Sequence, residues 1–237
     1  MISCNVFQHE IEAVARERGD ALDATYIELG EHARPSLLRK KLQDAIDAAV
    51  ACDAVLLFYG LCGRATDGLV ARDVPLVLPR CHDCCAVLLG GMARYAAVFR
   101  EMPSTPFSSI GFIRHGNYYF EDGDLVEGDS YEALVEKYGE DNAQYILEAM
   151  RPKLEGRLQP VYFISTPEVP CSAEKAACME KAASEGREFR ELEGSLRLIR
   201  MLLAGEHPPE EFLTVPPGCR IRQTGDWDSV FKCECAG

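Results

Sequence analysis

Basic residues are in short supply in this chain, and the deficit excludes partners that depend on positive charge. Lys and Arg together number 25, against 38 Asp and Glu, so the formal net charge is −13 at pH 7. The basic residues that are present do not gather into a local patch. We therefore expect neither nucleic acids nor anionic membrane surfaces among the partners of this protein.

Long apolar runs are missing as well. The longest one falls far short of the roughly 20 residues that cross a bilayer. The N-terminus has no basic segment followed by an apolar one, so no signal peptide is expected. We predict a cytoplasmic protein, whose thiols stay reduced and are free to bind a metal or to take part in catalysis. A chain that tolerates many free thiols also fits an anaerobe.

Several familiar motifs are absent too. The sequence has no Gly-x-Gly-x-x-Gly dinucleotide fingerprint and no P-loop. No Ser-His-Asp arrangement is readable. An Asp-x-His-x-x-Gly segment, which supplies a lower ligand to a corrinoid, is also missing, because Glu31 and His32 lack its spacing.

Cysteine, in contrast, is abundant: the chain has 11, an odd number that rules out complete internal pairing. Three thiols and one imidazole fall within residues 81–85, directly after the apolar run 74–78. Cys62 follows the apolar run 54–58, and Cys4 follows the first apolar residues of the chain. Donors of this kind at this density suit Zn²⁺ or an iron–sulfur cluster, and not Mg²⁺ or Ca²⁺.

The first hundred residues alternate between short apolar strands and amphipathic helices. Strands are predicted at 1–6, 24–29, 54–58, 74–78, 160–165 and 212–215. Helices are predicted at 10–19, 35–50, 84–100, 131–150, 173–183 and 192–203. Sequential strand–helix units with right-handed crossovers predict an α/β fold: a doubly wound, mostly parallel sheet with helices on both faces.

We expect one domain over residues 1–237. Its core would comprise residues 1–102 and 155–220. Residues 103–154, rich in Pro, Ser, Gly and Asp at their start, would form an irregular insertion or lid with a short strand or two. Residues 221–237 would form a C-terminal tail, which has no regular pattern from Asp226 onward.

Ligands of doubly wound sheets bind at the carboxyl ends of the strands. The candidate metal ligands all lie at or just after such ends, so they should gather on one edge of the sheet. They are Cys4, His32, Cys62, His82 and Cys84. The alternative is that these thiols only pack, since free cysteine is among the most buried residue types. His32 has a plainer interpretation as a surface residue.

Other residues near this edge are candidates for binding or catalysis. Tyr59, Gly60 and Gly63 belong to a turn whose glycines allow close approach of a ligand to the backbone. Three further residues, Glu10, Arg80 and Asp83, are candidates for catalytic roles. Glu10 is either a supporting base or a first-turn carboxylate favoured by the helix dipole. Arg80 is a candidate for orienting an anionic substrate, and Asp83 for orienting a ligating imidazole.

Cysteines outside this edge have simpler interpretations. Cys171 and Cys178 are seven residues apart, a spacing that fits one helix face and predicts packing. Cys233 and Cys235 flank a glutamate and could capture a metal transiently. A frayed tail is the interpretation we favour for them.

The chain resembles the domain of unknown function 1638 (DUF1638) family over nearly its whole length and in the family's order. The segments that carry the resemblance are Glu31-His32-Ala33-Arg34-Pro35, Tyr59-Gly60-Leu61-Cys62-Gly63, residues 74–80 with His82-Asp83-Cys84, Lys137-Tyr138-Gly139-Glu140, Leu192-Glu193-Gly194-Ser195-Leu196 and Val215-Pro216-Pro217-Gly218. Matched position by position, the resemblance also covers Cys4 and Glu10. Residues 113–118 depart from the family pattern, which implies a different closing loop.

The resemblance implies no settled activity. It implies a cytosolic protein of anaerobic bacteria or archaea, of a kind often encountered beside corrinoid-dependent methyltransferases. Taken with the thiols, it suggests a Zn²⁺ site of four ligands that activates a small-molecule thiol for methyl transfer, with a corrinoid protein or methyltransferase as partner.

Two alternatives stay open. One is an iron–sulfur protein that delivers electrons to reactivate a corrinoid. The other is an accessory module that binds a small molecule or a cobamide without catalysis. Whether the protein is an enzyme at all is left undecided by the sequence.

Overall fold

The computed structural model describes residues 1–29, 35–62, 64–101, 105–119, 140 and 159–235. The helix predicted at 131–150 and most of the predicted lid lie outside these residues. Among the helices that are described, none combines the length and the hydropathy that a bilayer crossing requires.

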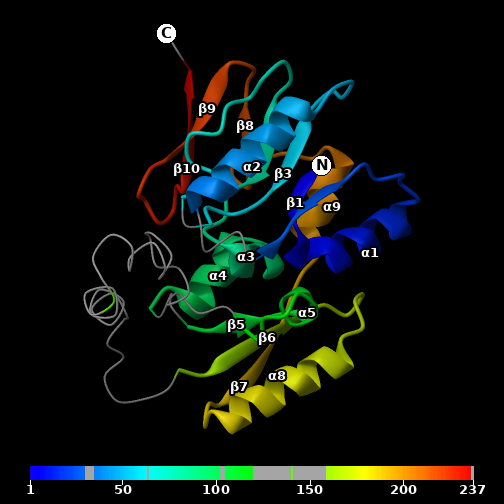
Figure 1. The fold of residues 1–237 in the computed structure, drawn as a ribbon, viewed down its shortest axis with the longest axis vertical. Coiled ribbons are helices and arrows are strands. Elements are labelled where there is room, and N and C mark those ends of the chain that lie inside the picture. Colours follow the sequence, from blue (N-terminus) through cyan, green and yellow to red (C-terminus); the bar gives the residue numbers. More distant parts are fainter. Residues whose placement is uncertain (30–34, 63, 102–104, 120–139, 141–158, 236–237) are drawn as a thin grey trace.

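A five-stranded sheet, which we call the central sheet, lies in the upper half of the view in Figure 1 and has the strand order β2-β1-β3-β4-β8. Its strands are β1 (Ile2–Cys4), β2 (Thr25–Ile27), β3 (Val55–Phe58), β4 (Leu76–Pro79) and β8 (Phe212–Val215). The first four are parallel, and β8 runs antiparallel to β4. This confirms an α/β fold with a mostly parallel sheet, in which the edge strand β8 is antiparallel. Double winding stays a prediction, because these pairings do not establish it.

The apolar content of the strands explains their position. All four residues of β4 are buried, and β3 has three buried residues of four. Parallel strands with both faces covered are near-continuously apolar. The runs 54–58 and 74–78 predicted these two strands to within two residues for this reason.

The helices that accompany the sheet follow the apolar periodicity of the chain. They are α1 (Gln8–Arg18), α2 (Pro35–Ala48), α3 (Cys84–Leu88), α4 (Met92–Phe99) and α9 (Arg197–Ala204). In α2 the buried residues Leu38, Leu42 and Ile46 recur every four positions, on one side of the helix. α1 ends at Gly19, whose φ of 73° is the left-handed conformation that glycine adopts without steric cost.

The helix predicted at 84–100 is in fact two helices, α3 and α4. Gly90 and Gly91, with φ of 81° and 132°, end the first and begin the second. A Cβ atom at Gly90 would lie 2.7 Å from Cβ of Ser195, so the break lets a distant segment pack closely against the chain. The apolar pattern continues across the break, which is why periodicity alone predicted one helix.

A second sheet is parallel throughout and has the order β5-β6-β7. It consists of β5 (Phe107–Ser108), β6 (Val161–Ser165) and β7 (Phe189–Glu193), accompanied by α5 (Ile110–Arg114) and α8 (Ser172–Ser184). The prediction of a helix from Leu192 was wrong at its start. Leu192 and Glu193 extend β7 because they pair with Ile164 and Ser165 of β6.

The two sheets share one hydrophobic core. Leu57 and Leu78 of the central sheet belong to the same buried cluster as Phe107 and Ile164 of the second sheet. Figure 1 shows α3, α4 and α5 between the two sheets. Gly111 of α5 packs directly on the segment after β1, because an added Cβ atom would collide with the backbone of Val6.

A C-terminal hairpin completes the described fold. Its strands, β9 (Cys219–Gln223) and β10 (Phe231–Cys235), are antiparallel over five residue pairs. The expectation of no regular pattern from Asp226 onward was therefore wrong for residues 231–235, and residues 221–223 of the expected tail belong to β9. Strand β9 also forms a bridge with Val70, so its partners come from a distant part of the sequence.

The contact at Gly111 leads to a stability prediction. Gly111→Ala should lower the free energy of unfolding by about 3 kcal/mol or more, because the methyl group has no space beside the backbone of Val6. Gly116→Ala is the control: no atom lies within 4 Å of its added Cβ, so it should cost only about 1 kcal/mol, from the strain of its positive φ of 87°. Urea unfolding of both variants measures the difference, and equal losses would contradict the proposed packing of the two sheets.

Candidate functional site

Two loops meet at the carboxyl edge of the central sheet. The backbone nitrogen of Leu61, after β3, donates to the carbonyl oxygens of Cys81 and His82, after β4, at 3.1 and 2.9 Å. A Cβ atom at Gly60 would lie 2.8 Å from the backbone of Asp83. The close approach that Gly60 permits is therefore to the neighbouring loop. Gly63, also a candidate for binding a ligand, lies outside the described residues.

Three thiols from three strand ends lie around this contact. Cys4 is the last residue of β1, Cys62 follows β3, and Cys84 is the first residue of α3 after β4. We call these three residues the edge thiols. All are buried, with exposed fractions of 1, 7 and 2%. The thiols of Cys62 and Cys84 are hydrogen-bonded to each other, and Cys4 is within electrostatic reach of Cys84.

Tyr59 is the polar side chain that supports this group. Its hydroxyl lies near the thiol of Cys4, and the side chain is fully buried. A phenol hydroxyl in this position favours the thiolate form of Cys4 and so lowers the pKa of its thiol. Tyr59 was a candidate for binding a ligand; in the structure its hydroxyl faces the thiol of Cys4, a residue of the protein itself.

The surroundings keep two of these thiols protonated at neutral pH. Burial, followed by the nearby Cys84, raises the pKa of Cys4 far above its ordinary value. The hydrogen bond with Cys62, followed by burial, raises the pKa of Cys84. A thiolate here needs a compensating positive charge, which a bound metal ion would supply while it displaces the protons.

The edge thiols are not arranged at metal-ligand distances. Within the part of the chain that the structure describes, only one group of three or more Cys, His, Asp or Glu residues has ligand atoms within 4.8 Å of one another, and it lies elsewhere. Cys62 has a φ of 47°, a left-handed conformation that costs about 1 kcal/mol for a non-glycine residue. Binding of an ion would draw the edge thiols together, and the strained backbone at Cys62 is one place where the loop would adjust.

His82 is turned toward the C-terminal hairpin. Its Nε2 donates to the carbonyl oxygen of Trp227 at 3.0 Å, and the two rings lie 4.4 Å apart between centroids. With the proton on Nε2, the lone pair of the neutral ring lies on Nδ1, the atom through which His82 could bind a metal. The other histidine candidate, His32, lies outside the described residues.

Asp83 and Arg80 make contacts that hold the local structure. The carboxylate of Asp83 accepts from the backbone nitrogen of Ala86 and from the hydroxyl of Tyr95, both at 2.9 Å, and so caps α3. The guanidinium of Arg80 donates to carbonyl oxygens at the ends of β8 and β10, to Phe231 at 2.6 Å for example. These contacts explain both residues as structural ones, and their candidate catalytic roles stay predictions.

Glu10 lies apart from the edge thiols. It is 2% exposed, its Oε2 has no hydrogen-bond partner, and burial raises its pKa to about 7. Glu10 also interacts with Cys171, whose pKa is raised chiefly by burial. Cys171 lines a cleft of about 370 Å³ that also includes Thr166, where a buried hydroxyl likewise has no partner. Sequence reasoning missed this cleft, because β6, β7 and α8 come together only in the fold.

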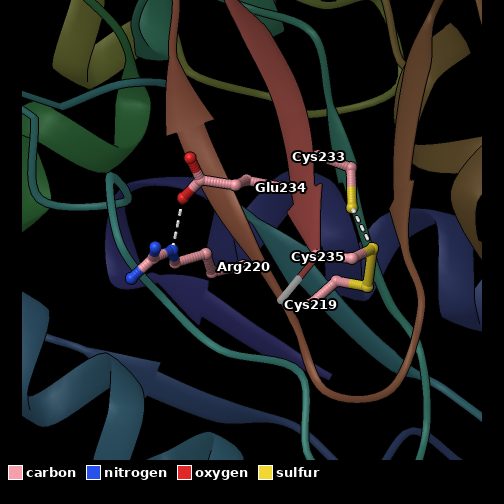
Figure 2. Close-up of a disulfide and its surroundings, with 5 residues drawn as sticks. All are labelled: Cys219, Arg220, Cys233, Glu234 and Cys235. Carbon is pink, nitrogen blue, oxygen red and sulfur yellow. Dashed lines mark hydrogen bonds and ion pairs between the residues drawn. A yellow bond between two sulfur atoms is a disulfide. The ribbon is translucent and has the colours of Figure 1, made fainter. Parts of the chain in front are cut away.

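The group that does lie at metal-ligand distances is in the C-terminal hairpin. Cys219 and Cys235 form a disulfide, and the sulfur of Cys233 lies 3.8 Å from that of Cys235 (Figure 2). These three residues could hold a metal ion, whose identity the geometry does not specify. The interpretation as a frayed tail was wrong. The Cys-x-Cys spacing was the available signal, because alternate residues of a strand share a face.

Comparison with known proteins gives one finding. A family model described as "Protein of unknown function (DUF1638)" matches residues 26–203. The match includes Cys62, His82 and Cys84, whereas Cys4 and the hairpin cysteines lie outside it. Comparisons with curated proteins and with solved structures return no match.

Burial of Glu10 predicts a specific dependence of stability on pH. Its folded pKa of about 7 exceeds the ordinary 4.5, so the folded state retains a proton that the unfolded state releases between these values. Stability therefore falls as pH rises through this window, by about 3 kcal/mol in total. Glu10→Gln removes the ionisation, so the variant should gain stability relative to the parent between pH 4.5 and 8.

Urea unfolding at pH 4.5, 6 and 8 measures this difference. The matched control is Glu12→Gln, on the same helix with a less buried carboxylate. A difference between Glu10→Gln and the parent that stays constant across the three pH values would contradict the assignment.

Proposed function

Because this chain belongs to the DUF1638 family, which is described as being of unknown function, we propose its role from the edge thiols themselves: a metal-thiolate protein that holds Zn²⁺ through Cys4, Cys62 and Cys84. The observation that carries this proposal is the convergence of three buried thiols from the ends of three parallel strands. His82 through Nδ1, or His32, would be the fourth ligand. Thiolate and imidazole are the donors that Zn²⁺ takes in proteins.

A metal bound at this site would displace the protons of Cys4 and Cys84, whose pKa values are raised. A soft or borderline cation stabilises thiolates that burial otherwise disfavours, and Tyr59 already presents its hydroxyl to Cys4. The positive φ of Cys62 adds to this argument, since strained backbone clusters at ligand-binding sites. Gly60 lets the two ligand-bearing loops touch.

The activity that we propose for this site is methyl transfer linked to a corrinoid methyltransferase system. With its histidine ligand displaced by a substrate thiol, a zinc ion at this site would hold that thiol as its thiolate. The role of the chain is to position the edge thiols around that site and to exclude water from it, which their burial supports. Arg80 and Asp83 would contribute by holding the loop after β4 in place.

An iron–sulfur cluster is the alternative use of the same thiols. Clusters are held by cysteine thiolates, so Cys81, which is also buried in this loop, would join Cys4, Cys62 or Cys84. The function would then be electron transfer that reactivates a corrinoid. Such a protein is brown when purified without oxygen, whereas a zinc protein is colourless.

A binding module without catalysis is the second candidate, and the cleft near Glu10 favours it. Its lining offers the buried hydroxyl of Thr166 beside the ion pair of Lys175 with Glu191, at 3.1 Å. A mixed polar and apolar cleft of this volume suits a small molecule. In that case the edge thiols would only pack, and the ligand or cobamide would bind beside α8.

Metal analysis of the protein and its thiol variants tests the proposal. We expect about one zinc per chain in protein purified anaerobically without added reductant, and a loss of most of it in Cys62→Ser and in Cys84→Ser. Cys52→Ser is the matched control, because Cys52 is exposed and should not affect the metal. Thermal unfolding of each variant shows whether it is folded when its metal is counted.

The other outcomes are equally informative. If the purified protein contains iron and sulfide and shows a broad visible absorption band, the site holds an iron–sulfur cluster and the zinc proposal is wrong. If the folded protein contains neither zinc nor iron, both the zinc site and the iron–sulfur cluster are contradicted, and the small-molecule cleft is favoured. Equal zinc in the parent and in Cys62→Ser would place the ion elsewhere.

A further inference from the structure

One face of the C-terminal hairpin carries three sulfur atoms. Cys235 pairs directly with Cys219 across the two strands, and Cys233 precedes Cys235 by two residues on β10. Alternate residues of a strand point to the same face, so all three share one. The next residues, Glu234 and Arg220, form an ion pair on the opposite face (Figure 2). The pattern separates a sulfur face from a charged face.

The sulfur atoms of Cys233 and Cys235 have the spacing of two ligands in a metal site. The Sγ atoms of Cys233 and Cys235 lie 3.8 Å apart, and one ligand atom from each of the three cysteines lies within 4.8 Å of the others. Tetrahedral zinc with Zn–S bonds of about 2.3 Å holds its sulfur ligands roughly 3.8 Å apart. A modest separation of the Cys219 and Cys235 sulfurs, after their bond is broken, completes the same arrangement.

We propose that Cys219, Cys233 and Cys235 form a redox-controlled site for a soft or borderline metal ion such as Zn²⁺. In the oxidised protein, the disulfide removes two of the three ligands and the site is closed. In the reduced protein, three thiolates bind the ion and leave one coordination position for water. The site is separate from the edge thiols and shares no residue with them.

The chemical balance of the switch is simple. A dithiol reductant gives two electrons and two protons to the disulfide, which becomes two thiols while the reductant becomes a disulfide. Cys233, a free thiol in the oxidised protein, takes no part in this step. Metal binding then displaces the protons of the three thiols into solution.

The hairpin has anchors that do not depend on the disulfide. The backbone nitrogens of Ala71 and Gly68 donate to the carbonyl oxygens of Cys219 and Ile221, at 2.9 and 2.8 Å. The guanidinium of Arg80 binds the carbonyl oxygen of Phe231 at 2.6 Å. These bonds keep β9 and β10 in place when the disulfide is reduced, so the three sulfurs stay close enough to bind one ion.

Counting zinc ions bound to the full-length protein tests the proposal. Oxidised and reduced protein are titrated with Zn²⁺ under a weak competing chelator, and bound ions are counted by native mass spectrometry. We expect the reduced protein to bind one more ion per chain than the oxidised protein. Cys233→Ser should lose this additional ion. Cys171→Ser, which removes a thiol of similar partial exposure, should retain it.

The design separates this site from the edge thiols. Cys62→Ser should retain the redox-dependent ion, whatever its effect on any ion bound at the edge of the sheet. Trp227, the single tryptophan of the chain, reports on the hairpin through its contact with His82. Its fluorescence should change little on reduction. The proposal is overturned if reduction adds no ion, if Cys233→Ser binds as many as the parent, or if reduction releases Trp227 from its contact.

Discussion

The parallel pairing of β1, β3 and β4 is the constraint on which the rest of the structure depends. Parallel strands in register bring their carboxyl ends to one edge, so thiols that lie up to eighty residues apart in the sequence become neighbours. The backbone bonds of Leu61 to the loop after β4, and the lack of a Cβ atom at Gly60, then hold two of these ends in contact. Without that contact, Cys62 and Cys84 would be separate buried cysteines.

The sequence was sufficient for features that depend on local pattern. The runs 54–58 and 74–78 are apolar throughout, as buried strands of a parallel sheet are, and this prediction placed Cys62 and Cys84 at the edge of the sheet. Features that depend on distant partners could not be predicted. The break at Gly90 accommodates Ser195, Leu192 belongs to a strand because β6 pairs with it, and His82 turns toward Trp227. Residue order does not indicate which way such side chains point.

The two sulfur groups differ in what burial does to them. The edge thiols are enclosed in the main core, where a thiolate needs a cation to be stable, so their chemistry follows the metal. Of the hairpin cysteines, Cys219 is buried, Cys233 is partly exposed and Cys235 is exposed, and two of them form a disulfide, so their chemistry follows the redox state of the surroundings. Arg80 and His82 contact the hairpin from the loop that carries Cys84. The two groups are thus mechanically connected although they share no ligand.

X-ray absorption at the zinc edge tests the central claim, that the edge thiols together hold a soft metal ion. Oxidised Cys233→Ser protein is the sample of choice, because its hairpin offers no set of three thiols. The account predicts about three sulfur neighbours at roughly 2.3 Å from the metal, with one fewer when Cys62→Ser is added. A spectrum with only nitrogen and oxygen neighbours, or one that Cys62→Ser leaves unchanged, would contradict it.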